Sequence, residues 1–511
     1  MQVSHVSRSA AASFDDPSLV SAAGLLPIVA LAQKVGLRDL ADQWLSVPTD
    51  KGANAGLKVS SLVAGMVAGA DSIDDMAVLR HGGMGRLFAS IYAPSTLGSL
   101  LRSFTFGHVR QLDAVASRLL INLAGEAPIL PTPTDSGMVF VDVDDTIVEV
   151  HGSKKQGAGF GYSGVRGLNA LLATVSTETT APVIIGQRLR KGAAGSPRGA
   201  ARIVADALKT VTRLPAMNAA PVLLRADSAY YGHATVTAAL RAGADVSITA
   251  RQDPAVKRAI GTIGDDAWTK IQYTDAIYDH DTDTWTSDAE VAEVPFTAFT
   301  SKPKKDRVHG RLVVRRIPEL NKKKLSQPTL FDTHRFHAFF TTSTLDTVTA
   351  DQVHRRHAVI EQVNADLKNS ALAHLPSGIF AANAAWLVLA VIAFNLTRTA
   401  ATITGAAPRE RDDRHDPPET RHHPRKDRVL RTPHPTPSPR SLALGNRMVT
   451  TVCARPRATA TLTPLVHPAD PARSTTQWNT AGSEARGSDA PTTTRRLRDP
   501  AAPHHRRTSV D

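Results

Sequence analysis

A stretch whose apolar side chains recur at every second position restricts the fold of this chain more than any other feature. In residues 138–150, Val141 and Val143 belong to one face, while Asp142 and Asp144 belong to the other. A period of two is that of a β-strand. We therefore expect a strand here that carries acidic side chains on one of its faces.

Further apolar segments follow this strand in the order strand, strand, helix, strand, helix, strand. We expect strands at 168–176 and 182–189, a helix from Ser196-Pro197 to about Leu214, a strand at 222–226, a helix at 234–242 and a strand at 245–250. The short gaps between the first three strands favour an antiparallel meander. The order predicts an α/β fold with a ribonuclease-H-like mixed sheet and flanking helices.

Changes in periodicity and composition divide the chain into five parts. We expect a helical domain at 1–135, the first part of the core at 136–252, a β-rich insertion with a basic Lys322–Lys324 turn at 253–334, the second part of the core at 335–404 with a strand at 336–341 and helices at 349–369 and 378–398, and a tail at 405–511. The tail is basic, holds 15 of the 32 prolines and has no apolar periodicity, so we expect it to be disordered. Its composition also fits a GC-rich gene read out of frame, which the DNA near codon 405 would decide.

Charge and cysteine content limit the class of protein. The net charge of +13 and the pI near 9.9 favour a polyanionic partner. One cysteine excludes an internal disulfide framework and a cysteine-rich zinc site. The longest apolar run, 384–394, is shorter than the roughly 20 residues that cross a bilayer. We expect a soluble, intracellular protein.

Three carboxylates occupy positions that suit metal-dependent phosphoryl transfer. Asp144 points out of the first strand, Asp227 follows the strand at 222–226, and Glu361 lies in a helix. Magnesium prefers such hard oxygen ligands, and a pair of ions activates the attacking oxygen and stabilises the leaving one. His357, Glu361, Asn364 and Lys368 share one face of that helix.

Several motifs together make the chain resemble a known family. They are Val141-Asp-Val-Asp-Asp-Thr146, Arg225-Ala-Asp-Ser228, the helix of Glu361 with its Lys368, Asp74-Asp-Met-Ala-Val-Leu-Arg-His81 and Ala93-Pro-Ser-Thr-Leu-Gly98. Over roughly residues 20–400 the sequence resembles a DDE transposase of a bacterial insertion sequence, most like the "thirteen-eighty" insertion-sequence family.

The resemblance implies roles for individual residues. Asp144 takes the first acidic position, with Asp142 as the alternative on the same strand face, and Asp227 and Glu361 take the second and third. The three would be catalytic residues and ligands of two Mg²⁺ ions, with Mn²⁺ as a substitute. Lys368 matches a DNA-contacting lysine of related enzymes.

The same comparison leaves the other DNA contacts open. His354 and His357 stand where related enzymes have a Tyr and an Arg, so Arg355 or Arg356 would replace those phosphate contacts. In the insertion, Trp268 or Trp285 would either stack on a flipped base or pack in the core. Further candidate backbone contacts are Lys154, Lys155, Arg188, Arg190, Lys191 and Lys302–Arg307.

The resemblance also implies an activity and partners. The helical domain would bind the terminal inverted repeats of the element, and the core would act as an endonuclease that cuts the ends and joins the freed 3′-hydroxyl to target DNA. Both DNA ends would be held by a homodimer in the bacterial cytoplasm, associated with the nucleoid and not with a membrane.

Two other interpretations remain open. Val141-Asp-Val-Asp-Asp-Thr-Ile-Val148 also fits the opening motif of haloacid-dehalogenase-type phosphatases, with Asp142 as nucleophile, Asp144 as acid and Gly264-Asp-Asp266 as a later acidic motif. The strands that follow at once argue against that fold. The second alternative is a non-enzymatic, DNA-binding remnant of a transposase.

Overall fold

The computed structural model describes residues 20–48, 50–88, 90–131, 133, 137–217, 220–279, 284–318 and 334–405. The predicted tail and the Lys322–Lys324 turn lie outside these residues. The described residues of the first part form helices. They are α1 (Leu25–Lys34), α2 (Leu37–Trp44), α3 (Ala55–Val67), α4 (Pro94–Arg102) and α5 (Phe106–Glu126), with 3-10 turns η1 (Asp50–Gly52), η2 (Asp74–Arg80) and η3 (Gly82–Arg86) between them.

A single mixed sheet follows the helices, and its first strands form the predicted meander. Its strands are β1 (Val139–Glu149), β2 (Gly159–Phe160), β3 (Arg166–Ser176), β4 (Val183–Lys191), β5 (Val222–Ala226), β6 (Asp245–Thr249), β7 (Thr269–Asp279), β8 (Thr284–Ala298), β9 (Val308–Pro318) and β10 (His334–Thr341). The order is β2-β3-β1-β5-β6-β10-β9-β8-β7, with β4 also paired to β3. β1 is antiparallel to β3 and parallel to β5, and β5 is parallel to β6. The mixed α/β architecture is compatible with the predicted ribonuclease-H-like order.

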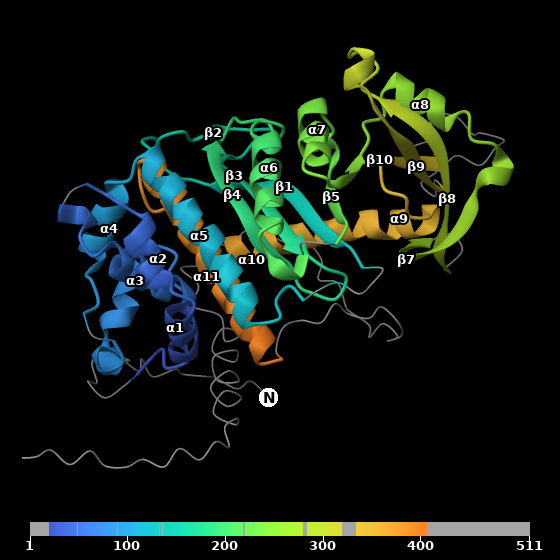
Figure 1. Cartoon of the computed structure of the whole chain (residues 1–511). Coiled ribbons are helices and arrows are strands. Elements are labelled where there is room, and N and C mark those ends of the chain that lie inside the picture. The colour runs from blue at the N-terminus through green and yellow to red at the C-terminus, as the bar shows by residue number, and fades with distance from the viewer. Residues whose placement is uncertain are drawn as a thin grey trace, which may run out of the picture. The chain divides into compact units, whose positions relative to one another are not determined.

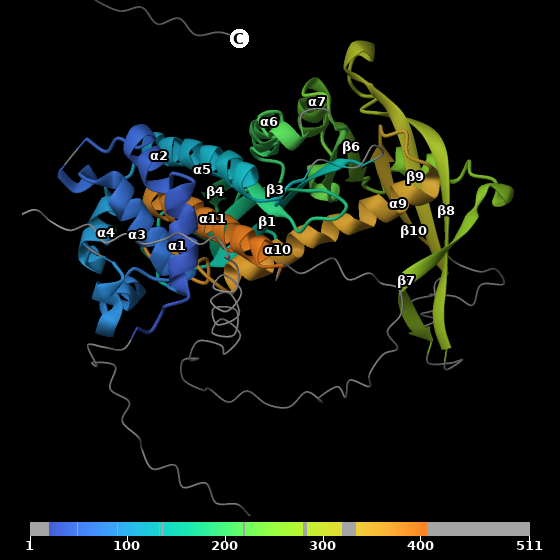
Figure 2. The same cartoon turned by 60° about the horizontal axis from the view of Figure 1, so that its bottom comes forward.

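Helices cover both faces of this sheet. On one face, α6 (Ala200–Val211) packs on β1, β3 and β4, and α7 (His233–Arg241) lies beside α6 (Figure 1). On the other face run α9 (Thr347–Arg355), the 3-10 turn η9 (Arg356–Ala358) and α10 (Val359–Lys368), with α10 against β1 (Figure 2). The sequence predicts one uninterrupted helix at 349–369, whereas the structure has η9 between α9 and α10.

Four further details differ from the expectations. The helix predicted to begin at Ser196-Pro197 begins at Ala200, because turns occupy 195–199 and Gly199 has a left-handed φ of 81°. The sequence analysis missed α8 (Pro254–Ile260), although the Asp253 carboxylate caps it and Pro254 occupies its first turn. It also missed β2. The strands of the expected insertion continue the core sheet, since β10 pairs with both β6 and β9.

The long helix α11 (Phe380–Ile403) fills the space between the sheet and the N-terminal helices. By length and composition it could cross a membrane, but 78% of its most apolar window is buried inside the protein. Its Asn395 makes two hydrogen bonds with the backbone of Ile184 in β4, accepting from N–H at 2.9 Å and donating to the carbonyl at 2.8 Å. These contacts are those of a core helix.

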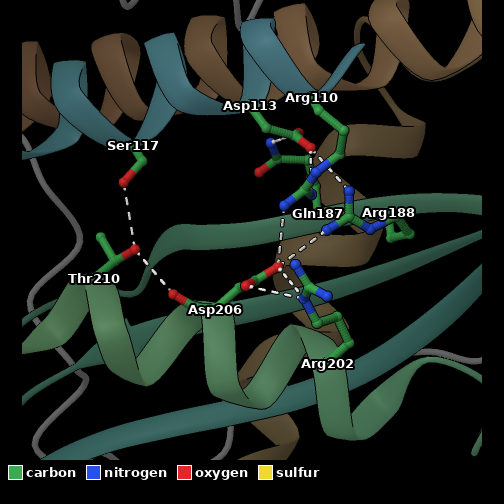
Figure 3. Close-up of polar contacts among 8 residues, drawn as sticks. All are labelled: Arg110, Asp113, Ser117, Gln187, Arg188, Arg202, Asp206 and Thr210. Atoms are coloured by element: carbon green, nitrogen blue, oxygen red, sulfur yellow. Dashed lines mark hydrogen bonds and ion pairs between the residues drawn. The ribbon is translucent and has the colours of Figure 1, made fainter. Parts of the chain in front are cut away.

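A cluster of charged side chains joins α5 to β4 and α6 (Figure 3). Asp113 of α5 accepts hydrogen bonds from Arg188 at 2.8 Å and from Gln187 at 2.7 Å. Arg110 bridges Asp113 and Asp206, at 2.8 and 3.2 Å. Burial raises the pKa of Asp113, and the two arginines oppose that rise. The cluster fixes the last N-terminal helix to the sheet.

This cluster generates a stability prediction. Asp113→Ala leaves Arg188 and Arg110 without their shared carboxylate, so we expect a loss of about 2–3 kcal/mol in the free energy of unfolding, measured by urea denaturation. The matched control is Arg202→Ala, because the Arg202 side chain is 75% exposed and pairs with Asp206 at the edge of the same cluster. Its expected loss is below about 0.5 kcal/mol. Equal losses in the two variants would contradict the assignment.

Candidate active site

The parallel pairing of β1 and β5 places Asp144 beside Asp227. Val143 lies opposite Ala226 in the register, and the two acids are the next residues along each strand. Neighbouring strands lie about 4.8 Å apart, so the two carboxylates start from adjacent backbone positions. Asp227 also caps the turn that follows β5, accepting a hydrogen bond from the N–H of Ala229 at 3.1 Å. Asp227 therefore both caps this turn and lines the candidate site.

Helix α10 brings a third acid to the same place. Asn364 of α10 donates a hydrogen bond of 2.8 Å from Nδ2 to Oδ2 of Asp144, which fixes the helix against β1. Glu361 precedes Asn364 by one turn, so both side chains lie on the same helix face. Asp144, Asp227 and Lys368 line one open cavity of about 660 Å³. Asp144 and Asp227 thus meet at this cavity, while Glu361 is not among the residues that line it, although its negative charge acts on Asp144.

The electrostatics of Asp144 reflect this crowding. Burial of its carboxylate raises the pKa from the usual 3.8 to about 7, and a hydrogen bond from the backbone of Asp145 opposes the rise. The negative charges of Asp227, Asp145 and Glu361 raise it further. Burial also raises the pKa of Asp227, while the positive charge of His357 lowers it. The negative charges around Asp144 thus add to the effect of its burial.

The alternative first acid, Asp142, has a different environment. Its side chain is 1% exposed, and both of its oxygens accept hydrogen bonds from Arg225, at 2.7 and 2.8 Å. The third Arg225 nitrogen donates to the carbonyl of Val353 in α9 at 2.8 Å, and its guanidinium lies over the ring of Phe140. Asp142 is therefore a structural partner of Arg225 and is closed to a substrate.

Asp145 belongs to a second buried network on the other side of Asp144. It accepts hydrogen bonds from the hydroxyl of Tyr230 and from Asn169, and it pairs with Arg190 at 3.1 Å. Arg190 also donates to the carbonyls of Ser196 and Arg198, at 2.8 and 2.6 Å. The network ties β1 to β3, to β4 and to the turn that carries Asp227. Asp144, Asp145 and Glu149 of β1 all line the cavity, and the carboxylate of Asp144 accepts the hydrogen bond from Asn364 of α10.

The four predicted DNA-contacting residues separate into two groups. Lys368 lines the cavity with Asp144 and Asp227, and the charge of His357 reaches Asp227. Arg355 pairs instead with Asp351 at 3.0 Å. Arg356 lines a different, smaller cavity of about 210 Å³ that also includes Arg225.

The histidine at the expected tyrosine position is part of the core. The His354 ring stacks on Phe339 with 4.0 Å between ring centroids, and hydroxyls of Ser247 and Thr249 lie within hydrogen-bond distance of its two nitrogens, at 2.9 and 3.1 Å. Burial lowers the pKa of His354 well below its usual value, which keeps the ring neutral at pH 7. A neutral, enclosed imidazole does not contact a phosphate.

Several other basic and aromatic candidates also have structural partners. Arg188 belongs to the cluster with Asp113, Arg190 belongs to the network of Asp145, and Lys155 donates to the carbonyl of Leu375. Trp268 lies beneath Arg316, with 4.3 Å from the guanidinium to the ring centroid, and near Phe336. The core interpretation of Trp268 is therefore favoured. The side chain of Trp285 lies outside those the structure describes.

Sequence reasoning missed most of the residues that position the acids. Asn364 was visible as a member of the polar helix face, but its contact with Asp144 was not. Tyr230 follows Asp227 by three residues, and Arg225 precedes it by two, so both stood inside or beside a recognised motif. Their partners come from other strands, and no spacing along the chain indicates them.

The residues at this edge fit a hard divalent cation. The donors are carboxylate oxygens, which Mg²⁺ prefers, and the mutual repulsion at Asp144 is what a cation relieves. Asn364 is 6% exposed, and its Oδ1 is a buried atom with no hydrogen-bond partner in the described part of the chain. No set of three acids or histidines among the described residues is already assembled around one metal position. The side chain of Glu361 is solvent-exposed.

The raised pKa of Asp144 generates a prediction for the metal-free protein. Between the unfolded value of 3.8 and the folded value of about 7, the folded state holds the extra proton, so stability falls as pH rises through this window. Asp144→Asn removes the charge. We expect it to stabilise the protein at pH 8, by on the order of a few kcal/mol, and to have little effect at pH 4. Urea unfolding in EDTA at both pH values measures this, and a pH-independent difference would contradict it.

Comparison with known proteins agrees with this geometry. A family model described as "Transposase DDE domain group 1" matches residues 3–412, and no curated protein matches the chain. The match spans the N-terminal helices, the whole sheet and the helix of Glu361. The chain belongs to the DDE-domain transposases of group 1.

Proposed function

We propose that this protein is a DNA transposase that binds the terminal inverted repeats of an insertion sequence and catalyses metal-dependent strand cleavage and transfer. The observation that carries the proposal is the register of β1 and β5, which sets Asp144 beside Asp227 beneath the helix of Glu361. Family membership supports the same class of activity. Asp144, Asp227 and Glu361 are the proposed catalytic residues and metal ligands.

The surrounding residues suggest how the chain would serve this chemistry. Two Mg²⁺ ions, or Mn²⁺ in their place, would supply activation of the attacking oxygen and stabilisation of the leaving oxygen. Asn364 holds Oδ2 of Asp144 and would orient this carboxylate toward a metal ion. Lys368 adds a positive charge to the wall of the cavity, where it would attract a phosphate group. His357 acts on Asp227 through its charge, while its ring Nδ1 lies 2.8 Å from the carbonyl of His354.

Other parts of the proposal follow from the resemblance and the fold. The ribonuclease-H-like core would comprise residues 136–252 and 335–404, with 253–334 as the insertion. The domain predicted at 1–135 would bind the element ends, and the predicted tail lies outside the described residues apart from Gly405. We further propose membership of the "thirteen-eighty" group, a homodimer assembled on the two DNA ends, target DNA as second substrate, and a place at the bacterial nucleoid.

The phosphatase alternative is not favoured. Its nucleophile would be Asp142, which is enclosed and held by Arg225. Gly264-Asp-Asp266 would have to join the site, yet Asp265 and Asp266 are solvent-exposed on a 3-10 turn, where Asp265 faces Arg316 at 3.7 Å. A remnant without its last core helices is also disfavoured, because α10 and α11 are both present.

The proposal predicts a specific separation of binding from cleavage. Asp144→Asn, Asp227→Asn and Glu361→Gln should each reduce nicking of a labelled element end to below detection in Mg²⁺, because each removes an anionic oxygen ligand. Binding of the same DNA in a gel-shift assay should persist. Asp366→Asn is the control and should nick normally, because Asp366 of α10 pairs with Arg398 of α11 at 3.6 Å and does not line the cavity. Cleavage that survives in all three variants would place the active site elsewhere.

Asn364 offers a second test through metal affinity. Because it orients a proposed ligand without being one, Asn364→Ala should weaken Mn²⁺ binding about 10- to 100-fold, measured by electron paramagnetic resonance of the free ion. Excess Mn²⁺ should then restore part of the nicking. Gln362→Ala, whose side chain bonds only Asp366 in the described contacts, should bind Mn²⁺ like the unaltered protein. Unchanged affinity in Asn364→Ala would remove its positioning role.

A further inference from the structure

An aromatic loop borders the cavity of Asp144 and Asp227. Three of the seven exposed large hydrophobic side chains among the described residues lie within 160–165, namely Phe160, Tyr162 and Val165. Phe160 is 66% exposed and Tyr162 is fully exposed, at 110%. Tyr162 and Val165 line the cavity. We call residues 159–165 the aromatic loop.

Backbone contacts hold the base of the aromatic loop in place. The tip is therefore exposed in a defined conformation. Gly192 donates a backbone hydrogen bond of 2.9 Å to the carbonyl of Gly157, and β2 pairs with β3. Gly161 packs closely on Gly192, since a Cβ at Gly161 would meet the Gly192 oxygen at 2.6 Å. The tip closes in a turn in which Gly164 has a left-handed φ of 70° and donates to the carbonyl of Gly161. Because the loop is anchored at its base and Tyr162 is fully exposed, this side chain can bind a ligand without giving up contacts in the protein core.

The residues around the aromatic loop are of the kinds that bind a nucleic-acid strand. Lys191 and Arg198 are exposed and flank the 192–196 segment that forms another wall of the cavity, and Lys368 contributes to the wall as well. Cations that follow a strand, together with aromatic rings on which bases stack, are the features of sites that bind single strands. A recessed cavity of about 660 Å³ favours a strand drawn out of the duplex, whose bases then lack stacking partners.

We propose that the aromatic loop stacks on an unpaired base of the DNA strand that enters the acid cavity, with Tyr162 as the principal contact. This inference rests on the proposed transposase function. It assigns base stacking to the connection between β1 and β3, and not to the tryptophans of the 253–334 segment. Tyr162 acts in binding and has no part in the bond-breaking step.

The test uses the full-length chain in EDTA and an oligothymidylate roughly twelve nucleotides long with one central 2-aminopurine. Stacking on an aromatic ring quenches the fluorescence of the base analogue. We expect Tyr162→Ala to raise the Kd about tenfold and to lose the quenching, because one stacked base is lost. Tyr162→Phe keeps the ring and should retain both. Ile403→Ala is the control and should bind and quench like the unaltered protein, since Ile403 is 51% exposed at the end of α11 and outside the helical domain.

Two outcomes would overturn the inference. One is an unchanged Kd and unchanged quenching in Tyr162→Ala. The other is intact oligonucleotide binding with a shift from dimer to monomer in sedimentation, which would make the aromatic loop a protein interface.

Nicking of a duplex element end in Mg²⁺, measured in parallel, separates this inference from the proposed function. If the unaltered protein nicks but Tyr162→Ala binds the oligonucleotide normally, only the stacking inference fails. If the unaltered protein binds and quenches the oligonucleotide but never nicks, only the transposase proposal fails.

Discussion

The buried ion pair between Arg225 and Asp142 is the contact on which the arrangement of the acids depends. Arg225 lies in β5, Asp142 lies directly opposite it in β1, and the same guanidinium reaches the carbonyl of Val353 in α9. One side chain therefore joins the three elements that lead to Asp144, Asp227 and Glu361. A buried ion pair is weak evidence for net stability, because desolvation costs roughly as much as the attraction returns. Its value here lies in register, since a slip of β1 against β5 would leave both charges unpaired.

The three aspartates of β1, Asp142, Asp144 and Asp145, have different environments and therefore different roles. Asp142 is neutralised by Arg225, and Asp145 by Arg190 together with Tyr230 and Asn169. Asp144 lies between these networks with an amide as its partner and no cation in hydrogen-bond contact among the described residues. The two flanking acids hold the strand still, while the middle acid keeps a raised pKa. Crowding of like charge is tolerated at a functional site because its neighbours fix the geometry.

Local patterns predicted much of this fold, and long-range contacts account for most of what they missed. Alternation in 138–150 and the apolar run at 222–226 identified β1 and β5, because each strand is buried and has a clear period. Helix α8 was missed although Asp253-Pro254 is a start signal, since the surrounding residues were interpreted as part of a β-rich insertion. The position of the acids was predicted from strand ends, but the partners of Asp142 and Asp145 were not. A partner 83 residues away leaves no trace in local spacing.

The break between α9 and α10 has a consequence for how this segment can evolve. The chain is fastened at Val353 by Arg225 and again at Asn364 by Asp144, with the 3-10 turn η9 between the two points. Adding or removing one residue there would rotate everything beyond it by about 100°, and would swing Glu361 away from the sheet. Alignments of related chains should therefore keep a constant number of residues between Val353 and Asn364.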